Sequence, residues 1–494
     1  MVPMETKVIK ADEKSYKKVI NAFKSRRTGA TPADIAAATG LPLNTVRELV
    51  PRAADEYSGR LEVTESGEIL YSFPKGYNSR YRGFIPFVRR AADTLIRTSI
   101  SAGTLIFKIW IMVMLIGYFL LFMAIALASV FLSAAASSSG KGSRRGRGNV
   151  NFSFGIFNLI FRLWFYSEMT RSFNSPYRSA GLQKPKSRPL HRAIFSFVFG
   201  DPDPNADFRD QEKRTFIDYL QEHKGIISLP EFMTLTGLKP DEADRAITSY
   251  CVEFSGSPEA TEEGTVVYRF DEILLRSDEK SRTGKTGLPL LLKKMESFSS
   301  NPGKMNWWFA LINGVNLIFG SYFLYNVSAI GHILPGKIQG IYGYVYYYLS
   351  YFGNPLPVIF LGLGIVPVVF SFLFWLVPLL RHFFLKDKNE KLRFENFRKF
   401  SYGKIWDSPL FITKTDLNPV NKEAGPSNPN EVPQDQDKVL MEMGTYAIPE
   451  ITLDDRKNEV YCFAELNREK EALEKYRSTV NPASLGNTVF DSEA

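Results

Sequence analysis

The 494-residue chain contains only two cysteines, Cys251 and Cys462, and only four histidines. Two distant cysteines form no CxxC pair, no disulfide framework and no thiolate cluster for zinc or an iron–sulfur centre. Residues 1–27 are lysine-rich and lack the apolar core of a cleavable signal peptide. The sequence also shows no Ser/His/Asp set, paired carboxylates or metal-ligand spacing. We therefore expect no enzyme activity, no cofactor and no metal.

Charged residues are missing from three long apolar runs, at residues 109–140, 306–328 and 356–380. A run of about 20 mostly apolar residues matches the hydrocarbon core of a bilayer, which is about 30 Å thick. Buried helices of soluble domains rarely continue so far without a charge. The sequence therefore predicts an integral, multi-pass membrane protein.

An internal repeat occupies the polar parts of the chain. Residues 31–73 align without a gap with residues 228–270, at a constant offset of 197 and with 12 identities in 43 positions. This agreement indicates an internal duplication. The shared positions include Thr39, Gly40 and Leu41 with Thr236, Gly237 and Leu238, and Tyr71 and Phe73 with Tyr268 and Phe270.

Both copies predict the same order of elements, with three helices followed by two short strands. The third helix of the first copy carries Val46, Val50 and Ala53 at the i, i+4, i+7 spacing of a buried stripe. Ser58 and Gly59 then lead into alternating strands joined by a turn, which is typical of a hairpin. Three helices and a hairpin in this order resemble a winged helix-turn-helix domain.

The C-terminal region resembles part of the same repeat. Tyr-Arg-Phe-Asp-Glu-Ile at residues 268–273 recurs as Tyr-Cys-Phe-Ala-Glu-Leu at residues 461–466. Only the hairpin is recognisable, because a Pro/Asn-rich stretch that is typical of a linker precedes it. Residues 437–480 are therefore a candidate for a degenerate third wing followed by a helix, and an unrelated hairpin is the alternative.

Basic residues predict the orientation in the membrane. The Tyr-rich segment 329–355 has one Lys, whereas Lys and Arg crowd both flanks of the last two apolar runs, so these flanks should be cytoplasmic. Related domains should share one compartment, which requires a second crossing after residues 103–137. The candidate, residues 151–168, carries Arg162, and an arginine at mid-bilayer costs about 2.5–3.5 kcal/mol. An interfacial helix is the alternative. We expect the plasma (inner) membrane, four spans and both termini in the cytoplasm.

The charge distribution disfavours nucleic acid as the partner of the repeated domains. Residues 31–73 have three basic and seven acidic side chains, a net charge of −4, and residues 228–270 have three and eight, a net charge of −5. Such domains should repel a duplex. The net charge of the chain is +9. The excess of Lys and Arg lies beside the apolar runs, where these side chains can pair with anionic lipid headgroups.

The predicted third helices supply candidate residues for recognising an unknown protein partner or a second copy of the chain. Arg162 is a separate candidate for a polar group within the membrane, and a transport role is the least favoured alternative. The candidate interaction residues are Arg47, Glu48, Arg52, Asp241, Glu242, Asp244 and Arg245.

Residues 195–205 read FSFVFGDPDPN. This run resembles a family of membrane proteins from cyanobacteria and plastids, and the resemblance implies a membrane location. Plant members of that family carry an iron–sulfur-assembly label, which two distant cysteines do not support. In physical terms, residues 201–205 predict a rigid turn, and residues 193–199 predict a short apolar helix.

We expect an α-helical membrane protein with α+β winged-helix domains at the cytoplasmic face and an internal duplication. The hypothesis for its role is a non-enzymatic scaffold or adaptor, and the alternative is a membrane-tethered DNA-binding regulator. The predicted segments are a first winged-helix-like domain (1–78), a basic juxtamembrane segment (79–102), a transmembrane helix (103–137), a basic Gly/Ser loop (138–150), a second transmembrane or interfacial helix (151–168), a linker with FSFVFGDPDPN (169–208), a second winged-helix-like domain (209–275), a basic linker (276–305), a transmembrane helix (306–328), a Tyr-rich extracytoplasmic loop (329–355), a transmembrane helix (356–380), a basic segment and Pro/Asn-rich linker (381–436), the candidate third wing and helix (437–480) and a tail (481–494).

Overall fold

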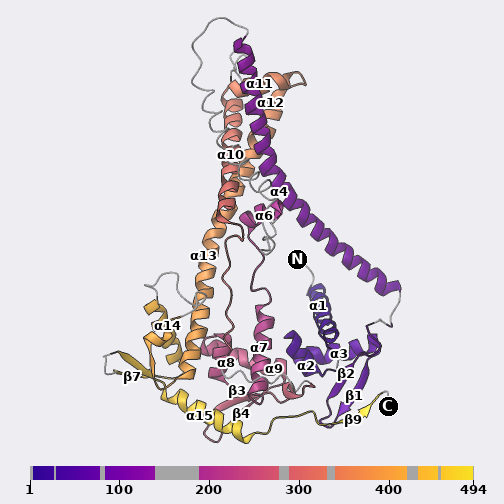
Figure 1. The fold of residues 1–494 in the computed structure, drawn as a ribbon, viewed down its shortest axis with the longest axis vertical. Coiled ribbons are helices and arrows are strands. Elements are labelled where there is room, and N and C mark those ends of the chain that lie inside the picture. Colours follow the sequence, from indigo (N-terminus) through magenta and orange to yellow (C-terminus); the bar gives the residue numbers. More distant parts are fainter. Residues whose placement is uncertain are drawn as a thin grey trace, which may run out of the picture. The chain divides into compact units, whose positions relative to one another are not determined.

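Helices dominate the computed structural model, and three small sheets accompany them in the residues it describes (Figure 1). The chain divides into unit 1, residues 1–90, 202–296 and 387–494, and unit 2, residues 91–201 and 297–386. The structure describes residues 4–26, 29–77, 80, 84–138, 189–277, 289–330, 340–419, 432–453 and 458–492.

The apolar runs form long helices. Within the described residues, three helices are long and apolar enough to cross a membrane, over 102–132, 303–329 and 355–407. These agree with the three predicted apolar runs. The predicted crossing at 151–168 and its Arg162 lie outside the described residues. The elements are α4 (Phe84–Ser138), α10 (Gly303–Ile330), α11 (Gly340–Ser350), α12 (Pro355–Pro357), η4 (Val358–Ile365) and α13 (Val366–Asp407).

Two buried asparagines join the apolar helices of unit 2. Asn313 Nδ2 donates to the Ser371 carbonyl oxygen at 2.9 Å, and Asn316 Nδ2 donates to the Leu115 carbonyl oxygen at 2.8 Å. Each bond links α10 to another helix, α13 in the first case and α4 in the second. Side-chain amides that bond across helices contribute to packing where apolar burial does not distinguish protein from lipid.

Unit 1 contains a similar order of elements three times. We define module 1 as residues 4–73, module 2 as residues 208–270 and module 3 as residues 387–463. Module 1 has a single bridge, Ala30 with Tyr71, where modules 2 and 3 have a strand before the second helix. Module 1 contains α1 (Met4–Lys24), α2 (Pro32–Thr39), α3 (Leu43–Tyr57), β1 (Arg60–Thr64) and β2 (Ile69–Ser72). Module 2 contains α7 (Phe208–Glu222), β3 (Ile226–Ser228), α8 (Leu229–Thr236), α9 (Pro240–Phe254), β4 (Ser257–Ala260) and β5 (Val266–Arg269).

Module 3 begins with the end of α13. Residues 387–407 of that helix lead into a short strand and a short helix, and α14 and a hairpin follow. The remaining elements are β6 (Ile412–Thr413), η5 (Lys414–Leu417), α14 (Val432–Gly444), β7 (Glu450–Leu453), β8 (Glu459–Cys462) and then α15 (Ala464–Thr479) and β9 (Thr488–Asp491).

The predicted segments at the C-terminus therefore differ from the structure. Residues 381–436 are not only a basic segment and linker, because α13 continues to Asp407 and β6 pairs with β8. Phe397, Tyr402 and Ile405 of α13 are buried in the core of unit 1. Lys and Arg residues lie between these buried positions, and for this reason the sequence predicted a basic segment beside the membrane. Similarly, the predicted tail 481–494 contributes β9.

Strand pairing follows one pattern in modules 2 and 3. The sheets have the orders β3-β5-β4 and β6-β8-β7, with the second hairpin strand in the centre. Tyr268 pairs with Ile227 and Pro258, and Tyr461 pairs with Ile412 and Ile451. In module 1 the order is β2-β1-β9, because β9 adds to the outer edge of β1.

The short second helix of each module starts with a capping box. The pairs are Thr31 with Asp34 in α2, Ser228 with Glu231 in α8 and Thr413 with Asp416 in η5. In a capping box the hydroxyl and the carboxylate satisfy each other's backbone N–H groups. Gly40 and Gly237 end α2 and α8 with φ of 70° and 73°, a left-handed conformation that glycine adopts without steric cost.

Candidate functional site

The acidic residues predicted on the third helix of module 2 are exposed. Asp241, Glu242, Asp244 and Arg245 lie in the first turns of α9. Arg245 Nε donates to the carbonyl oxygen of Asp241 at 3.2 Å, which keeps that guanidinium on its own helix. The start of α9 therefore presents a surface on which negative charge predominates.

The residues predicted on the third helix of module 1 are engaged differently. Arg47 Nη1 donates to Glu272 Oε2 at 2.6 Å, and the Arg52 guanidinium lies 4.8 Å from the centroid of the Tyr16 ring. Of the three candidates on α3, Glu48 and Arg52 are exposed and Arg47 is half-buried. The Arg47 guanidinium therefore binds within unit 1, at the segment after module 2. Helix α3 also contacts α9.

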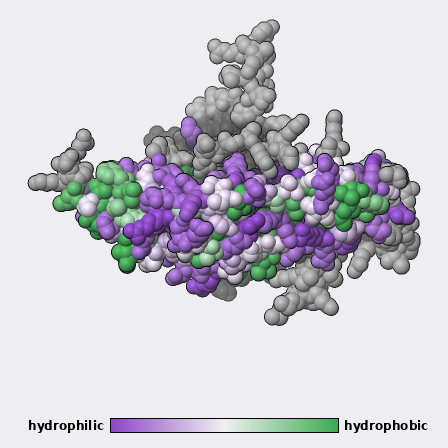
Figure 2. All heavy atoms as spheres, turned by 90° about the horizontal axis from the view of Figure 1, so that it is seen from below, coloured by the Kyte–Doolittle hydropathy of each residue, from purple (hydrophilic) through white to green (hydrophobic). Residues whose placement is uncertain are grey.

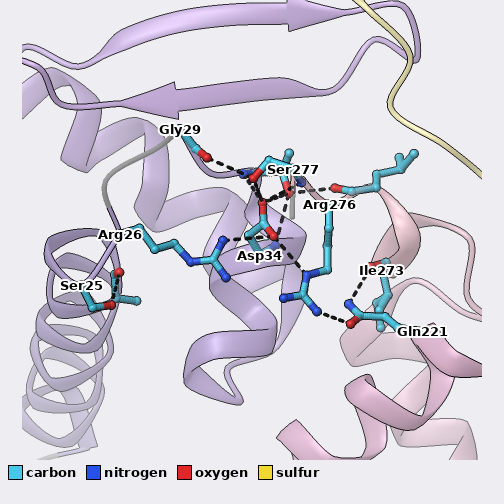
Figure 3. A network of polar contacts seen from close by, with 11 residues as sticks. Ser25, Arg26, Gly29, Asp34, Gln221, Ile273, Arg276 and Ser277 are labelled. Atoms are coloured by element: carbon cyan, nitrogen blue, oxygen red, sulfur yellow. Dashed lines mark hydrogen bonds and ion pairs between the residues drawn. The ribbon is translucent and has the colours of Figure 1, made fainter. Parts of the chain in front are cut away.

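A buried carboxylate connects module 1 to the segment after module 2 (Figure 3). Asp34 has no exposed surface, and its Oδ1 lies 3.0 Å from Arg276 Nε and 3.2 Å from Arg26 Nη1. Its Oδ2 accepts the Ser277 hydroxyl at 2.6 Å and the Ser277 backbone N–H at 3.0 Å. Gln221 of α7 accepts from Arg276 and extends the network into module 2.

These contacts stabilise the charged form of Asp34. Burial by itself would raise the pKa of the Asp34 carboxyl group, but hydrogen bonds from Ser277 and Thr31 and the charge of Arg26 together hold that pKa below its ordinary value. The carboxylate is thus ionised at neutral pH, and its removal would leave buried guanidinium groups without compensation.

Module 2 has a corresponding carboxylate with its own arginine. Glu231 of the α8 capping box receives both terminal nitrogens of Arg477, at 2.8 Å and 2.6 Å. Arg477 Nη2 also donates to the Ile226 carbonyl oxygen at 2.7 Å. The two-point geometry matches the planar guanidinium to the carboxylate. Helix α15, which follows module 3, is thereby fastened to module 2.

The corresponding carboxylate of module 3 is exposed. Asp416 Oδ2 accepts from the Thr413 backbone N–H at 2.9 Å and from the Thr413 hydroxyl at 2.6 Å. Among the described residues, no arginine or lysine forms an ion pair with it. Module 3 therefore differs from modules 1 and 2 at this position.

Apolar side chains are exposed on module 3. Ile448, Ile451 and Leu453 are 79%, 61% and 69% exposed, on or just before the edge strand β7. Figure 2 shows a hydrophobic patch at the left end of this face, toward the position of β7 in Figure 1, and a second, smaller hydrophobic cluster toward the right. Edge strands usually avoid such exposure because they pair readily with other chains. Module 3 therefore exposes apolar side chains along an unpaired strand edge.

A second titratable group links α15 to module 3. Glu469 accepts hydrogen bonds from the Tyr446 hydroxyl at 3.0 Å and 2.9 Å. Burial raises the pKa of Glu469 to about 7, the Tyr446 bond opposes this rise, and the charge of Glu231 adds to it. Ionisation of Glu469 therefore costs the folded state free energy.

This raised pKa predicts that the folded state loses stability as the pH rises from about 5 to about 8. A carboxyl group whose pKa is higher in the folded than in the unfolded chain favours folding only while it is protonated. The loss should be on the order of 3 kcal/mol. Urea unfolding at pH 5 and pH 8 measures this loss of stability, which should be absent from Glu469→Gln. Glu465→Gln, an exposed position on the same helix, is the control, and an equal loss in the wild type and Glu469→Gln would contradict the assignment.

The FSFVFGDPDPN run begins in helix α6 (Leu190–Phe199), so the predicted helix at 193–199 is confirmed. Arg381 Nη2 donates to the carbonyl oxygens of Phe197 at 3.0 Å and Phe298 at 2.6 Å. Its guanidinium would collide with any side chain at Gly200, which has φ of 88°. Within unit 2, the end of α6 and Gly200 therefore pack against Arg381, and these contacts serve packing.

The structure places Cys251 and Cys462 as free, half-buried thiols. Burial raises the pKa of Cys251 to about 11, so this thiol stays protonated at neutral pH. In the described ranges no group of three or more His, Cys, Asp or Glu side chains could hold a metal ion.

Sequence reasoning missed the buried ion pairs. The pattern of a hydroxyl residue followed three positions later by a carboxylate was visible at Thr31, Ser228 and Thr413. It identifies a capping box but not the arginine that covers it. The arginines lie 242 residues from Asp34 and 246 residues from Glu231, and no local pattern relates residues at that separation.

No family model and no solved structure matches the chain. The chain is similar to an uncharacterised chloroplastic protein of Arabidopsis thaliana, with 24% identity over 426 residues that cover 81% of this chain and 74% of that protein. The name of that relative assigns it no activity.

Proposed function

We propose that the chain is a membrane-anchored scaffold whose three modules form a docking platform for a protein partner. The observation that carries this proposal is the set of exposed apolar side chains on module 3, at Ile448, Ile451 and Leu453. Apolar surface of this kind, rimmed by polar residues, is typical of protein interaction sites.

In this proposal the modules are winged-helix domains that arose by duplication. The recurring order of elements, the three capping boxes and the shared sheet order of modules 2 and 3 support that origin. So do the gapless alignment of residues 31–73 with 228–270 and the left-handed Ser58 and Ser255, with φ of 53° and 56°.

We also propose that all three modules lie on the cytoplasmic side of the membrane. Residues 1–90, 202–296 and 387–494 belong to one unit, so the chain must cross the membrane an even number of times between them. Helices α10 and α13 supply two crossings, while α4 supplies one. A further crossing would lie in residues 139–188, as the segment 151–168 predicts.

The identity of the membrane is a separate part of the proposal. The basic flanks favour a cytoplasmic orientation in a plasma (inner) membrane and contact with anionic lipid headgroups. The similarity to a chloroplastic protein is compatible with a plastid membrane of the same orientation.

Protein recognition is favoured over DNA binding by the state of the third helices. Arg47 is bound to Glu272, and α3 contacts α9, so α3 is not free to enter a groove. The exposed start of α9 carries Asp241, Glu242 and Asp244. A duplex would meet negative charge where recognition by a winged helix needs positive charge.

We therefore expect no measurable affinity for a random 30-base-pair duplex at moderate salt. The full chain in nanodiscs of zwitterionic lipid should leave the fluorescence anisotropy of the labelled duplex unchanged. The triple variant Asp241→Lys, Glu242→Lys and Asp244→Lys should gain salt-dependent binding, because each added cation releases condensed counterions. Salt-resistant binding by the wild type would favour a membrane-tethered DNA regulator instead.

The scaffold proposal is tested by quantitative affinity purification from mildly solubilised native membranes. The double variant Ile451→Lys and Leu453→Lys should lose a defined set of proteins that the wild type retains. Val252→Lys is the matched control, because Val252 is 72% exposed on α9 of module 2 and should retain the same proteins. A protein set that does not depend on Ile451 and Leu453 would contradict the proposal.

A further inference from the structure

The capping boxes of α2, α8 and η5 differ in which other segment of the chain packs over them. In each module we use the term cap face for the surface made by the capping carboxylate and by the backbone carbonyl five residues before it. These are Asp34 with Gly29, Glu231 with Ile226 and Asp416 with Phe411.

The cap face of module 1 is covered by the segment after module 2. The Ser277 hydroxyl lies within hydrogen-bonding distance of both acceptors, 3.0 Å from the Gly29 carbonyl oxygen and 2.6 Å from Asp34. Arg276 supplies the positive charge to Asp34, and the Leu275 carbonyl oxygen accepts the Thr31 hydroxyl at 2.7 Å. An arginine-bearing segment thus satisfies both acceptors of this face.

The cap face of module 2 is covered by the helix after module 3. Arg477 alone reaches both acceptors, the Ile226 carbonyl oxygen and the Glu231 carboxylate. Lys224 Nζ donates in return to the carbonyl oxygens of Arg477 at 2.6 Å and Val480 at 3.0 Å. In both modules the carboxylate is therefore met by an arginine and the carbonyl oxygen by a side-chain donor, from a segment that follows the next module.

The cap face of module 3 is open in the described residues. Phe411 is 59% exposed, its neighbour Leu410 is 51% exposed, and Asp416 is exposed as well. A cleft of about 300 Å³ lies beside Leu410 and Phe411. It is lined by three acidic residues and one basic residue, so it carries a net negative charge. The charged lining residues are Asp407, Glu471, Glu474 and Lys470.

From this comparison we propose that the cap face of module 3 binds an arginine-bearing segment of a partner protein. The guanidinium would bind Asp416 and the Phe411 carbonyl oxygen, and an apolar neighbour would pack on Leu410 and Phe411. This inference rests on the proposed function, since it names the chemistry of the partner.

The chain itself does not supply this segment within its described residues. The cap faces of modules 1 and 2 are each covered from beyond the next module, but helix α15, which follows module 3, binds module 2 through Arg477. Strand β9 of the tail is paired with β1. The covering arginines of a second copy, Arg276 and Arg477, are already bound within that copy. A different protein is therefore the expected occupant.

The test is photocrosslinking from position 411 of the full chain. p-Benzoylphenylalanine replaces Phe411, the chain is expressed in its native membranes, and the crosslinked peptides are identified by mass spectrometry. We expect a peptide of another protein with an arginine within a few residues of the crosslink. Asp416→Lys should reduce its yield at least about tenfold, because a charge-assisted pair is replaced by repulsion.

Two variants separate loss of charge from loss of the fold. Asp416→Asn keeps an oxygen for the Thr413 cap while it removes the charge, and it should also reduce the crosslink. Glu222→Lys reverses an exposed carboxylate on α7 of module 2 and should leave the crosslink yield unchanged. Absence of any crosslink, a crosslink only to lipid or to a second copy, a peptide without arginine, or a yield that is insensitive to Asp416 would each overturn the inference.

Failure of this inference can be distinguished from failure of the proposed function. If the proteins that depend on Ile451 and Leu453 are retained while no arginine-bearing peptide is found at position 411, the scaffold stands and the cap-face assignment falls. If those proteins are also absent, both proposals fall.

Discussion

Asp34→Asn is expected to destabilise the contact between module 1 and the segment after module 2 by about 3–5 kcal/mol. Asparagine has nearly the same shape, but it removes the negative charge that Arg276 contacts in the buried network. Hydrogen exchange of the full chain in nanodiscs measures this directly. The amides of α2 and of residues 271–277 should exchange at least about a hundredfold faster, since 1.4 kcal/mol corresponds to a factor of ten.

The double variant Asp34→Asn with Arg276→Met identifies the ion pair as the cause. Replacing both members of a buried pair is often nearly neutral, so the double variant should recover part of the protection. Glu48→Gln, at an exposed position, should not change the exchange rates. If the effects of the two single substitutions simply add, Asp34 and Arg276 do not interact and this account of the contact is wrong.

The lowered pKa of Asp34 also sets the direction of its pH dependence. Its contribution is fully present above the pKa of an unfolded aspartate, near 3.9, and is lost as the pH falls through the lower pKa of the folded state. The protection of α2 should consequently be constant between pH 5 and pH 7, and the difference between wild type and Asp34→Asn should narrow only in stronger acid.

Arg477→Met is expected to release α15 from module 2. The substitution leaves Glu231, whose side chain is 3% exposed, with an uncompensated negative charge, and breaking such a pair costs about 3–5 kcal/mol. An ion pair that remains between α15 and module 2, Lys475 with Glu263 at 2.5 Å, lies at the surface and contributes little. A broad-specificity protease should cleave α15 about a hundredfold faster in the variant, because cleavage follows the population of the open form.

Two further variants complete this experiment. Arg468→Met removes an exposed arginine from the same helix and should leave the cleavage rate unchanged. Glu231→Gln with Arg477→Met removes both charges and should be cleaved more slowly than Arg477→Met alone. Rapid cleavage in Arg468→Met, or equal rates in the single and double variants, would show that α15 is held by something other than this pair.

Elements with strong local signals were accessible from the sequence. The three apolar runs became helices because a backbone in hydrocarbon must satisfy its own hydrogen bonds. The capping boxes, the turn at Gly40 and Gly237 and the hairpins follow from short-range patterns at residues 31–73 and 228–270. The start of module 3 was missed because Lys and Arg interrupt the buried stripe of Phe397, Tyr402 and Ile405.

By itself, then, the amino-acid sequence determined the membrane-compatible helices, the repeated order of local elements and the acidic start of α9. Only the tertiary structure decided which carboxylates are covered. Asp34 and Glu231 are met by arginines from distant segments, and Asp416 is left exposed. The physical reason is that a capping box depends on neighbouring residues, whereas burial of its charge depends on a cation brought to it by the folding of the whole unit.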